Sequence, residues 1–298
     1  MTSLMHDFPS ENADGFVGLR YYAPPTDLAD YVGTAYLFTA IREQVSDITR
    51  ADMGQVRFML SGGPGDYQFA TGAVAATPDI CLIGPTSGAT RFCVAGPVQV
   101  FGFSLLPLGW QAFIDHDASN CADGIADLAQ LRPDMVPLFH DLRRLTDPQA
   151  ALDLLWDRLR QMKKAEVSCV DRHFVESADA WLADERSPRV ELLLAQTGLS
   201  SRQAARLANR LYGAPPKYLA RKYRALRCAA QIAIDHRGWQ EMCGDGTFYD
   251  QSHLIREIKH FIGITPTQLR TEPTLVHRLS LPQRRSLPKP VSEISLIS

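Results

Sequence analysis

Two groups of side chains, fifty residues apart, have the types and spacing needed to contact the edges of DNA bases. Each group lies on the outward face of a predicted amphipathic helix whose other face is an apolar stripe. Arg and Asn can form paired hydrogen bonds with guanine and adenine edges, and Ala or Ile can touch a thymine methyl group. The first group is Arg202, Ala205, Arg206 and Asn209, and the second is Gln251, Ser252, Ile255 and Arg256.

The two helices that must position these groups have the same start and stop signals. Ser200 and Asp250 are N-cap residues whose side chains can accept from free N–H groups of the first turn, and Gln203 completes a capping box with Ser200. Gly213 and Gly263 end the helices, and a proline follows each glycine by three residues. A repeat of cap, apolar core, Arg, Gly and Pro is a stronger indication than any single motif. The helices, here called the repeat helices, are predicted from Ser200 to Leu211 and from about Gln251.

The repeat resembles the paired helix-turn-helix domain of AraC/XylS-type transcription regulators. The resemblance is carried by Ala-Gln-Thr-Gly-Leu-Ser-Ser-Arg at 195–202, Tyr-Asp-Gln-Ser-His at 249–253 and Gly-Ile-Thr-Pro at 263–266, and it covers roughly 170–270. It implies that the eight outward residues are base-reading positions in double-stranded promoter DNA. It also implies an N-terminal domain that responds to a small-molecule effector, and a homodimer made through the helices that link the two domains.

A third predicted helix, Pro216 to Asp235, joins the two repeat helices. Its twenty residues span ~30 Å, close to the ~34 Å between successive major grooves on one face of DNA. One chain could thus place both repeat helices in adjacent grooves. Five basic residues on the joining helix are expected to be phosphate neighbours or salt-bridge partners: Lys217, Arg221, Lys222, Arg224 and Arg227.

The segment in front of the second repeat helix departs from the family pattern. Residues 239–247 should form a compact apolar helix that ends in glycine, but Thr247 stands at that end. Gly244 and Gly246 each cost ~1 kcal/mol relative to Ala within a helix. We therefore expect a short helix here, and a second unit that binds DNA more weakly or only with support from its neighbours.

The N-terminal part reads as short strands between Gly- and Pro-rich turns, which is typical of a small barrel or sandwich. Together with the C-terminal match it resembles a divergent cupin-like domain. The predicted fold class is therefore α+β: a small cupin-like β-barrel, followed by an all-α domain with two helix-turn-helix units joined by a long helix. The predicted strands are 34–38, 56–60, 67–70, 79–83, 91–94 and 98–103, with a possible edge strand at 16–19. The predicted divisions are 1–130 (sensory), 131–168 (linking helices), 169–271 (DNA-binding) and 272–298 (tail).

The linking helices carry an apolar stripe that needs a partner. On the helix predicted over 148–164, the stripe consists of Leu152, Leu155, Trp156 and Leu159. It could form a dimer contact or cover the open face of the barrel, and the sequence favours neither. Beyond Glu272, the Arg284-Arg285 pair and several prolines predict a disordered tail.

Charge is divided unevenly along the chain. Residues 186–271 hold 14 Lys and Arg against 6 Asp and Glu, whereas residues 1–185 hold 13 against 25. An anionic partner is therefore expected for the C-terminal part only. The polar N-terminus and the absence of an apolar run near ~20 residues argue against a signal peptide or membrane span. The six cysteines show no paired spacing, which favours a reduced, cytoplasmic setting.

No pattern in the chain points to catalysis. A metal-dependent cupin needs clustered histidines on its strands, but His6, His116 and His140 lie outside the predicted strands. A nucleophile motif, a phosphate loop and a dinucleotide fingerprint are also missing. Cys81 and Cys93 fit buried apolar positions better than a thiol sensor. The sequence thus predicts no metal, no cofactor and no enzyme. The rival hypothesis is a small-molecule-binding or enzymatic barrel with a degenerate DNA-binding domain.

Overall fold

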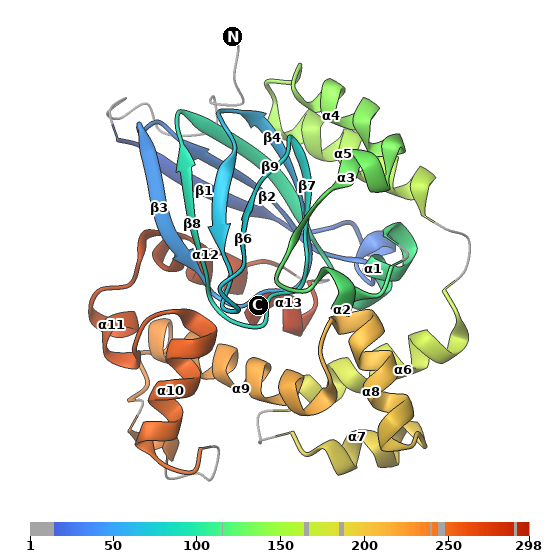
Figure 1. Cartoon of the computed structure of the whole chain (residues 1–298), viewed down its shortest axis with the longest axis vertical. Coiled ribbons are helices and arrows are strands. Elements are labelled where there is room, and N and C mark those ends of the chain that lie inside the picture. The colour runs from blue at the N-terminus through green and yellow to red at the C-terminus, as the bar shows by residue number, and fades with distance from the viewer. Residues whose placement is uncertain are drawn as a thin grey trace.

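The N-terminal part of the chain folds into two antiparallel sheets that face each other (Figure 1). The structure is a computed structural model, and it describes residues 15–114, 116–163, 167–184, 188–238, 240–243, 248–288 and 291–297. The larger sheet has the strand order β1-β2-β9-β4-β7-β10, and the smaller has the order β3-β8-β5-β6. The strands are β1 (Val17–Tyr22), β2 (Val32–Ala40), β3 (Gln44–Thr49), β4 (Gln55–Ser61), β5 (Gly65–Gln68), β6 (Val74–Ala76), β7 (Ile80–Ile83), β8 (Thr90–Ala95), β9 (Val98–Leu105) and β10 (Ile125–Asp127).

The strands do not close into the predicted barrel. The larger sheet ends at β1 and β10 and the smaller at β3 and β6, so the domain is an open double sheet. The helical spacing of residues 125–131 predicts a helix there, but the first three residues pair as β10 with β7, and only Leu128–Leu131 is helical (α3). The Pro-Pro-Thr sequence at 24–26 predicts a short helix over 27–32, but the structure has a single turn at Thr26–Leu28, because Val32 already pairs with Leu105 of β9. In each case pairing to a distant strand overrides the local pattern.

The larger sheet is buried on both faces. On one face, Met59 and Val100 pack with Phe92 of the smaller sheet in a core between the sheets. On the other face, the Phe58 ring stacks on Phe139, with 6.4 Å between ring centroids. The helices in this region are α1 (Pro107–Phe113), α2 (Ala118–Cys121), α4 (Val136–Leu142) and α5 (Pro148–Met162).

The apolar stripe of α5 is buried within the chain itself. Leu152, Leu155, Trp156 and Leu159 belong to the same core as Phe58 and Phe139. The linking helices therefore cover the larger sheet, which was one of the two interpretations left open by the sequence.

The C-terminal helices share this core with the sheets. They are α6 (Cys169–Ala183), α7 (Val190–Thr197), α8 (Ser201–Tyr212), α9 (Pro216–Ala233), α10 (Gln251–Ile262) and α11 (Pro266–Thr271). In Figure 1, α9 runs across the lower part of the molecule with α8 at one end and α10 at the other. Its 18 residues span ~27 Å. Before α10, the described residues contain only a 3-10 turn at Glu241–Cys243. Trp239, Gly244, Gly246 and Thr247 lie outside the described residues, as does His6.

The predicted disorder of the tail is wrong for most of its length. Two helices, α12 (Leu275–Arg285) and α13 (Glu293–Ile297), follow the DNA-binding part. The first packs against β1 and β3, and the second against α9 and α6. Arg284 is buried, and two contacts stabilise its charge there. Its Nη2 lies 3.1 Å from Asp52 Oδ2, and its guanidinium group lies over the Tyr21 ring. Both partners are more than 200 residues away in sequence, so local composition could not reveal them.

Candidate functional site

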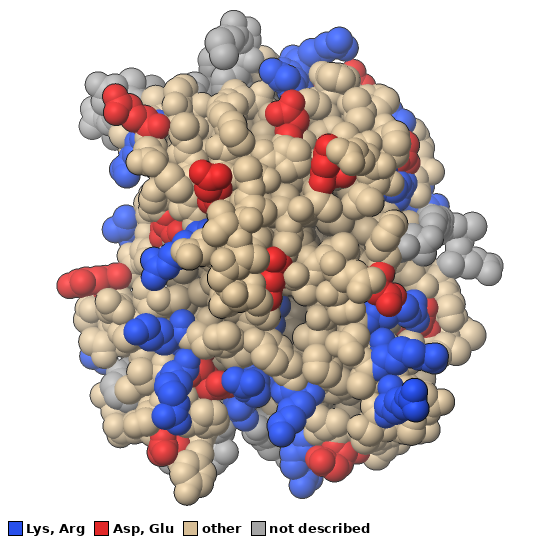
Figure 2. Space-filling view, viewed as in Figure 1, with Lys and Arg blue, Asp and Glu red and all other residues tan. Residues whose placement is uncertain are grey.

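Lys and Arg side chains gather on the lower part of the molecule, where α8, α9 and α10 lie (Figure 2). The exposed members on these three helices are Arg202, Arg206, Lys217, Arg256 and Lys259. A concentration of exposed positive charge on one side is what an anionic polymer such as DNA requires.

The first repeat helix, α8, begins at a complete capping box. The Ser200 Oγ accepts from the Gln203 N–H at 3.4 Å, and Gln203 Oε1 accepts from the Ser200 N–H at 3.0 Å. Gly213 ends the helix with φ of 81°, in the left-handed region that favours glycine. The helix is therefore fixed at both ends by its own sequence.

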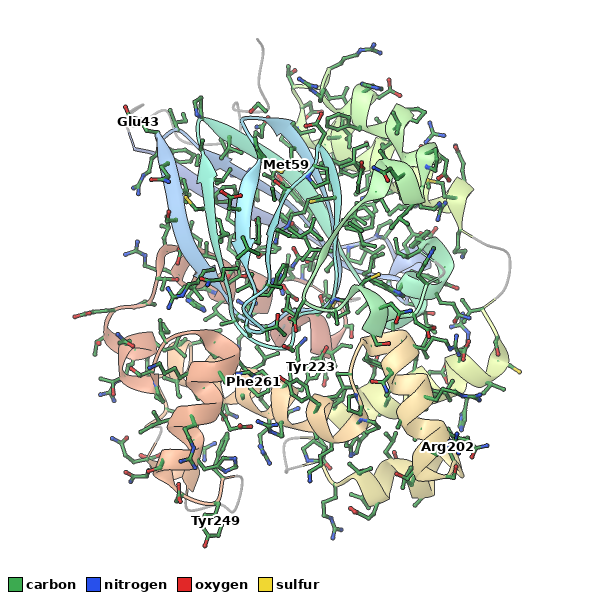
Figure 3. All side chains as sticks on the ribbon, viewed as in Figure 1. Glu43, Met59, Arg202, Tyr223, Tyr249 and Phe261 are labelled. Atoms are coloured by element: carbon green, nitrogen blue, oxygen red, sulfur yellow. The ribbon has the colours of Figure 1, made fainter. Side chains whose placement is uncertain are left out.

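The four outward residues of α8 lie together on one face. Arg202 and Arg206 are exposed, and Ala205 and Asn209 are half-buried. All four line one notch, whose far side includes Asp117 from the turn before α2. Arg202 points away from the body of the protein in Figure 3. This face thus offers two guanidinium groups and an amide to a polymer in the notch.

The second repeat helix, α10, presents its group in the same way. Its cap is Asp250, whose Oδ1 accepts from the His253 N–H at 2.6 Å, and Gly263 ends it with φ of 92°. Gln251, Ser252 and Arg256 are exposed and Ile255 is half-buried. Tyr249, which the sequence did not single out, is 92% exposed and projects beyond the helix start (Figure 3).

The basic residues of α9 do not act as one phosphate-binding row. Lys222 is only 4% exposed, and its Nζ donates to the carbonyls of Asp52 at 2.6 Å and Thr86 at 3.1 Å. Burial lowers the pKa of Lys222 to about 8. The expectation that Lys222 is a phosphate neighbour is therefore wrong, because its buried ammonium group ties α9 to the backbone of two loops. The burial of Lys222 between α9 and these loops depends on Asp52, which is 170 residues away in the chain.

Other basic residues of α9 also have partners inside the protein. Arg221 Nη2 lies 2.7 Å from Glu257 Oε1, and Arg224 Nη2 lies 4.0 Å from Glu257 Oε2. Arg227 donates to the Asp184 carbonyl at 2.8 Å, at the end of α6. Salt bridges and helix capping account for these three, and Lys217 is exposed.

Both repeat helices end against the same loops of the double sheet. The carbonyls of Phe261 and His260, at the end of α10, accept from the N–H groups of Ala51 at 2.7 Å and Ala89 at 2.9 Å. At the end of α8, a Cβ added to Gly213 would lie 3.1 Å from the Pro85 side chain. The loop at 84–89 therefore contacts both units, and the loop at 50–54 contacts the second.

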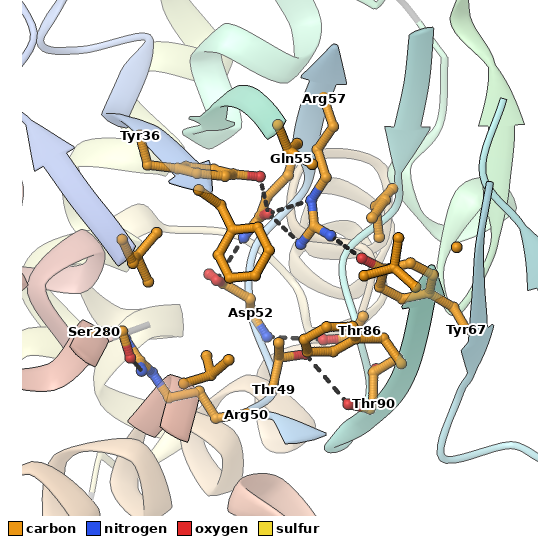
Figure 4. A pocket seen from close by; sticks show the side chains of 18 of the residues that line it. Tyr36, Thr49, Arg50, Asp52, Gln55, Arg57, Tyr67, Thr86, Thr90 and Ser280 are labelled. Atoms are coloured by element: carbon orange, nitrogen blue, oxygen red, sulfur yellow. Dashed lines mark hydrogen bonds between the residues drawn. The ribbon is translucent and has the colours of Figure 1, made fainter. Parts of the chain in front are cut away.

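A cavity lies between the two sheets, next to these loops (Figure 4). Inside it, Tyr36 OH donates to Gln55 Oε1 at 3.0 Å, and Gln55 Nε2 donates to Asp52 Oδ2 at 2.7 Å. Burial alone would raise the pKa of Asp52, but the positive charges of Arg284 and Arg50 hold it below its usual value. Residues from β1, β2, β4, β8 and α12 line the cavity together with Arg50, Asp52 and Thr86 of the two loops.

Little in the amino-acid sequence points to this cavity. Its one signal is Arg57, which lies two residues from Met59 on β4 and thus on the face that meets the smaller sheet. A charge at such an inward position needs an explanation. The contribution of α12 to the wall had no signal, since that segment was expected to be disordered.

The described residues contain no group of three or more His, Cys, Asp or Glu side chains that could hold a metal ion. None of the described helices is long and apolar enough to cross a membrane.

Residues 193–272 match a family model described as a helix-turn-helix domain, which confirms the resemblance of the repeat. No curated protein matches the chain. The solved structures similar to it include two of ToxT and one of CuxR. ToxT from Vibrio cholerae O395, bound to (E)-4-(8-methylnaphthalen-1-yl)but-3-enoic acid, has 10% identity and a TM-score of 0.42 over 87% of this chain and 99% of that one. ToxT from strain SCE256 of the same organism, bound to an unsaturated fatty acid, has 10% identity and a TM-score of 0.41 over 88% and 96%.

The AraC-like transcriptional activator CuxR has 12% identity and a TM-score of 0.29 over 72% and 87%. At these scores the three structures do not transfer a ligand or a mechanism to this chain.

Proposed function

We propose how this chain, a DNA-binding transcriptional regulator with an AraC-type helix-turn-helix domain at its C-terminus, reads a promoter and senses a small molecule. Residues 1–130 form the sensory part, 131–168 the helices that cover it, and 169–271 the DNA-binding part. Within the segment 272–298, helix α12 closes one side of the sensory cavity. Contact with chromosomal DNA would place the protein in the cytoplasm.

The eight outward residues of α8 and α10 read base edges in adjacent major grooves. The observation that carries this proposal is the pair of capped helices at the two ends of α9, each with its polar face exposed. The ~27 Å of α9 falls short of the ~34 Å groove repeat. Because α8 and α10 lie beyond its ends, their outward faces can be separated by more than the length of α9 itself.

A salt titration of DNA affinity tests this function. The wild-type chain should prefer its own upstream region over random DNA, and log affinity should fall steeply with log salt, by about 0.9 per phosphate contact. The rival, a sensory barrel with a degenerate DNA-binding domain, predicts no preference at any salt concentration, and that result would refute the regulator.

Single substitutions separate base reading from phosphate contact. Arg206→Ala should lower the affinity for the preferred site by about 10- to 100-fold and relax the base preference at one position. Lys217→Ala, on the exposed side of α9, should weaken all sequences alike. Uniform losses from both variants would reduce Arg206 to a phosphate contact.

The cavity between the sheets is the proposed sensor. Its lining includes Arg50, Asp52 and Thr86, in the loops that contact α8, α9 and α10. A small molecule that shifts these loops would change how the two repeat helices are presented to DNA. A homodimer is also consistent with the resemblance, but it would need a surface other than the buried stripe of α5.

A further inference from the structure

The cavity between the sheets carries more positive than negative charge. Among its lining residues are three guanidinium groups and one carboxylate, those of Arg50, Arg57, Arg284 and Asp52. Arg284 is paired with Asp52 at 3.1 Å, and Arg50 Nη1 donates to Ser280 Oγ at 2.9 Å. Burial and the charge of Arg284 lower the pKa of Arg50 to about 10, so that Arg50 stays protonated at neutral pH. Three positive charges and one negative charge thus line the cavity.

Arg57 has neutral hydrogen-bond acceptors among the described residues. Its Nε and Nη2 donate to Gln55 Oε1 at 3.1 and 2.8 Å, and its Nη1 donates to Tyr67 OH (Figure 4). These bonds use three of the five N–H groups of a guanidinium, which leaves one on each terminal nitrogen. The rings of Tyr36 and Tyr67 lie 6.0 and 5.3 Å from the guanidinium carbon and restrict its movement.

An anion at this position would relieve an electrostatic cost. A charge removed from water without a counter-ion is destabilising, and a carboxylate can accept from both terminal nitrogens of an arginine at once. Asp52 cannot serve, because it already pairs with Arg284 and accepts from Gln55. Among the described residues that line the cavity, there is no other carboxylate.

The remaining walls are apolar and leave a small space. Phe38, Met59, Ile83, Phe92 and Val100 are among the lining residues. The space open to the centre of a water molecule is about 100 Å³, and a cavity of roughly 150 Å³ is known to hold benzene. The apolar body of an occupant is therefore limited to a short chain or a single ring. Helix α12 covers one side of this space.

We infer that the cavity binds a small organic carboxylate, whose anionic group pairs with Arg57 and whose apolar body lies between the two sheets. This inference rests on the sensory role proposed above for the same cavity, and it names the chemical class of the effector. Neutral molecules of the same shape should be poor effectors, because they leave the charge of Arg57 without a counter-ion.

Calorimetric titration of the full chain with matched pairs of probes tests the inference. Hexanoate is compared with hexan-1-ol, and benzoate with benzyl alcohol. At least one carboxylate should bind 10-fold or more tightly than its alcohol. Arg57→Gln should lower the carboxylate affinity to that of the alcohol, and Arg57→Lys should restore part of it. Arg91→Gln, at an exposed position of β8, should change nothing.

The alcohols also report whether the cavity of the Arg57→Gln variant is intact, because their weak binding should survive the substitution. Alcohols that bind as tightly as their carboxylates, carboxylate binding unchanged in Arg57→Gln, or no binding by any of the four probes would each overturn the inference. DNA preference is measured in parallel on the wild-type chain without any carboxylate. A protein that prefers its upstream region but binds no probe would remain a regulator without this effector class.

Discussion

The two helix-turn-helix units are held in place by different means. The first has a complete supporting helix, α7, and a capping box on α8. The second has only a 3-10 turn in the described residues before α10, and its cap is a single Asp250 contact. Instead, tertiary contacts hold α10 in place. Glu257 of α10 pairs with Arg221 of α9, and two backbone hydrogen bonds join α10 to the sensory loops.

This difference suggests a division of labour. The first repeat helix is capped and ended by its own sequence, although α8 also packs against α1 and α2. A unit stabilised by the loops beside the cavity follows those loops when they move. We therefore expect the first unit to supply steady DNA affinity and the second to carry most of the response to the effector.

We expect the largest loss of stability from removal of the Glu257 carboxylate. Glu257 is 5% exposed and faces both Arg221 and Arg224. Glu257→Gln should lower the free energy of unfolding by about 2 to 3 kcal/mol, below the range for fully buried pairs because Arg221 is partly exposed. Urea denaturation measures this change in the free energy of unfolding. The control is Glu191→Gln, at an exposed position of α7, which should change that free energy by less than about 0.5 kcal/mol. Equal small losses would show that the second unit does not depend on this pair.

The two helix-ending glycines should differ in their tolerance of a side chain. Both have positive φ, but a Cβ at Gly263 would collide with Ile48, whereas one at Gly213 would lie 3.1 Å from the Pro85 side chain. Gly213→Ala should cost about 1 kcal/mol from the backbone alone, and Gly263→Ala about 2 kcal/mol or more. Thermal denaturation gives the ranking. The reverse order would mean that the first unit is pressed more tightly against the sensory loops than the second.

Removal of the caps should affect the first unit at least as much as the second. Ser200→Ala breaks the reciprocal capping box, and Asp250→Ala breaks one cap contact, so each should cost about 1 kcal/mol. Ser200→Thr and Asp250→Asn keep a cap oxygen and serve as controls with small losses. A much larger loss from Asp250→Ala would contradict the idea that the second unit is held by tertiary contacts.

The smallest effect near neutral pH should come from Asp179 of α6, which accepts from Tyr212 OH of α8 at 2.6 Å. Burial raises the pKa of Asp179 to about 7. The folded state then binds a proton more tightly than the unfolded state, whose carboxyl has a pKa of ~3.9. The stability that this proton contributes is present at low pH and is lost as pH rises toward 7 and just above.

Asp179→Asn should remove that part of the pH dependence of the first unit. Denaturation at pH 5, 6, 7 and 8 would show it as a flatter curve in the variant than in the wild type. Asp235→Asn, at an exposed position after α9, should leave the curve unchanged. An identical slope in wild type and Asp179→Asn would place the pKa of Asp179 outside this window.

The parts of the molecule that could be predicted from the sequence depend on neighbours in the chain. Ser200 and Gln203 form a capping box because three residues separate them, and Gly213 and Gly263 end helices because only glycine adopts positive φ without strain. The apolar stripes of the repeat helices follow from helical periodicity in the same way. The faces that carry Arg206 and Arg256 were therefore visible before any tertiary contact was known.

Tertiary structure alone decided the rest, because the partners lie far apart in the chain. Strand order made an open double sheet instead of a barrel, and Lys222 became an interface residue only when Asp52 and Thr86 came next to α9. Helix α12 of the tail forms one wall of the cavity because Arg284 pairs with Asp52. Local sequence determines where a helix begins and which of its faces is polar. The role of a buried charged side chain depends instead on its partner, and the tertiary fold determines which group that partner is.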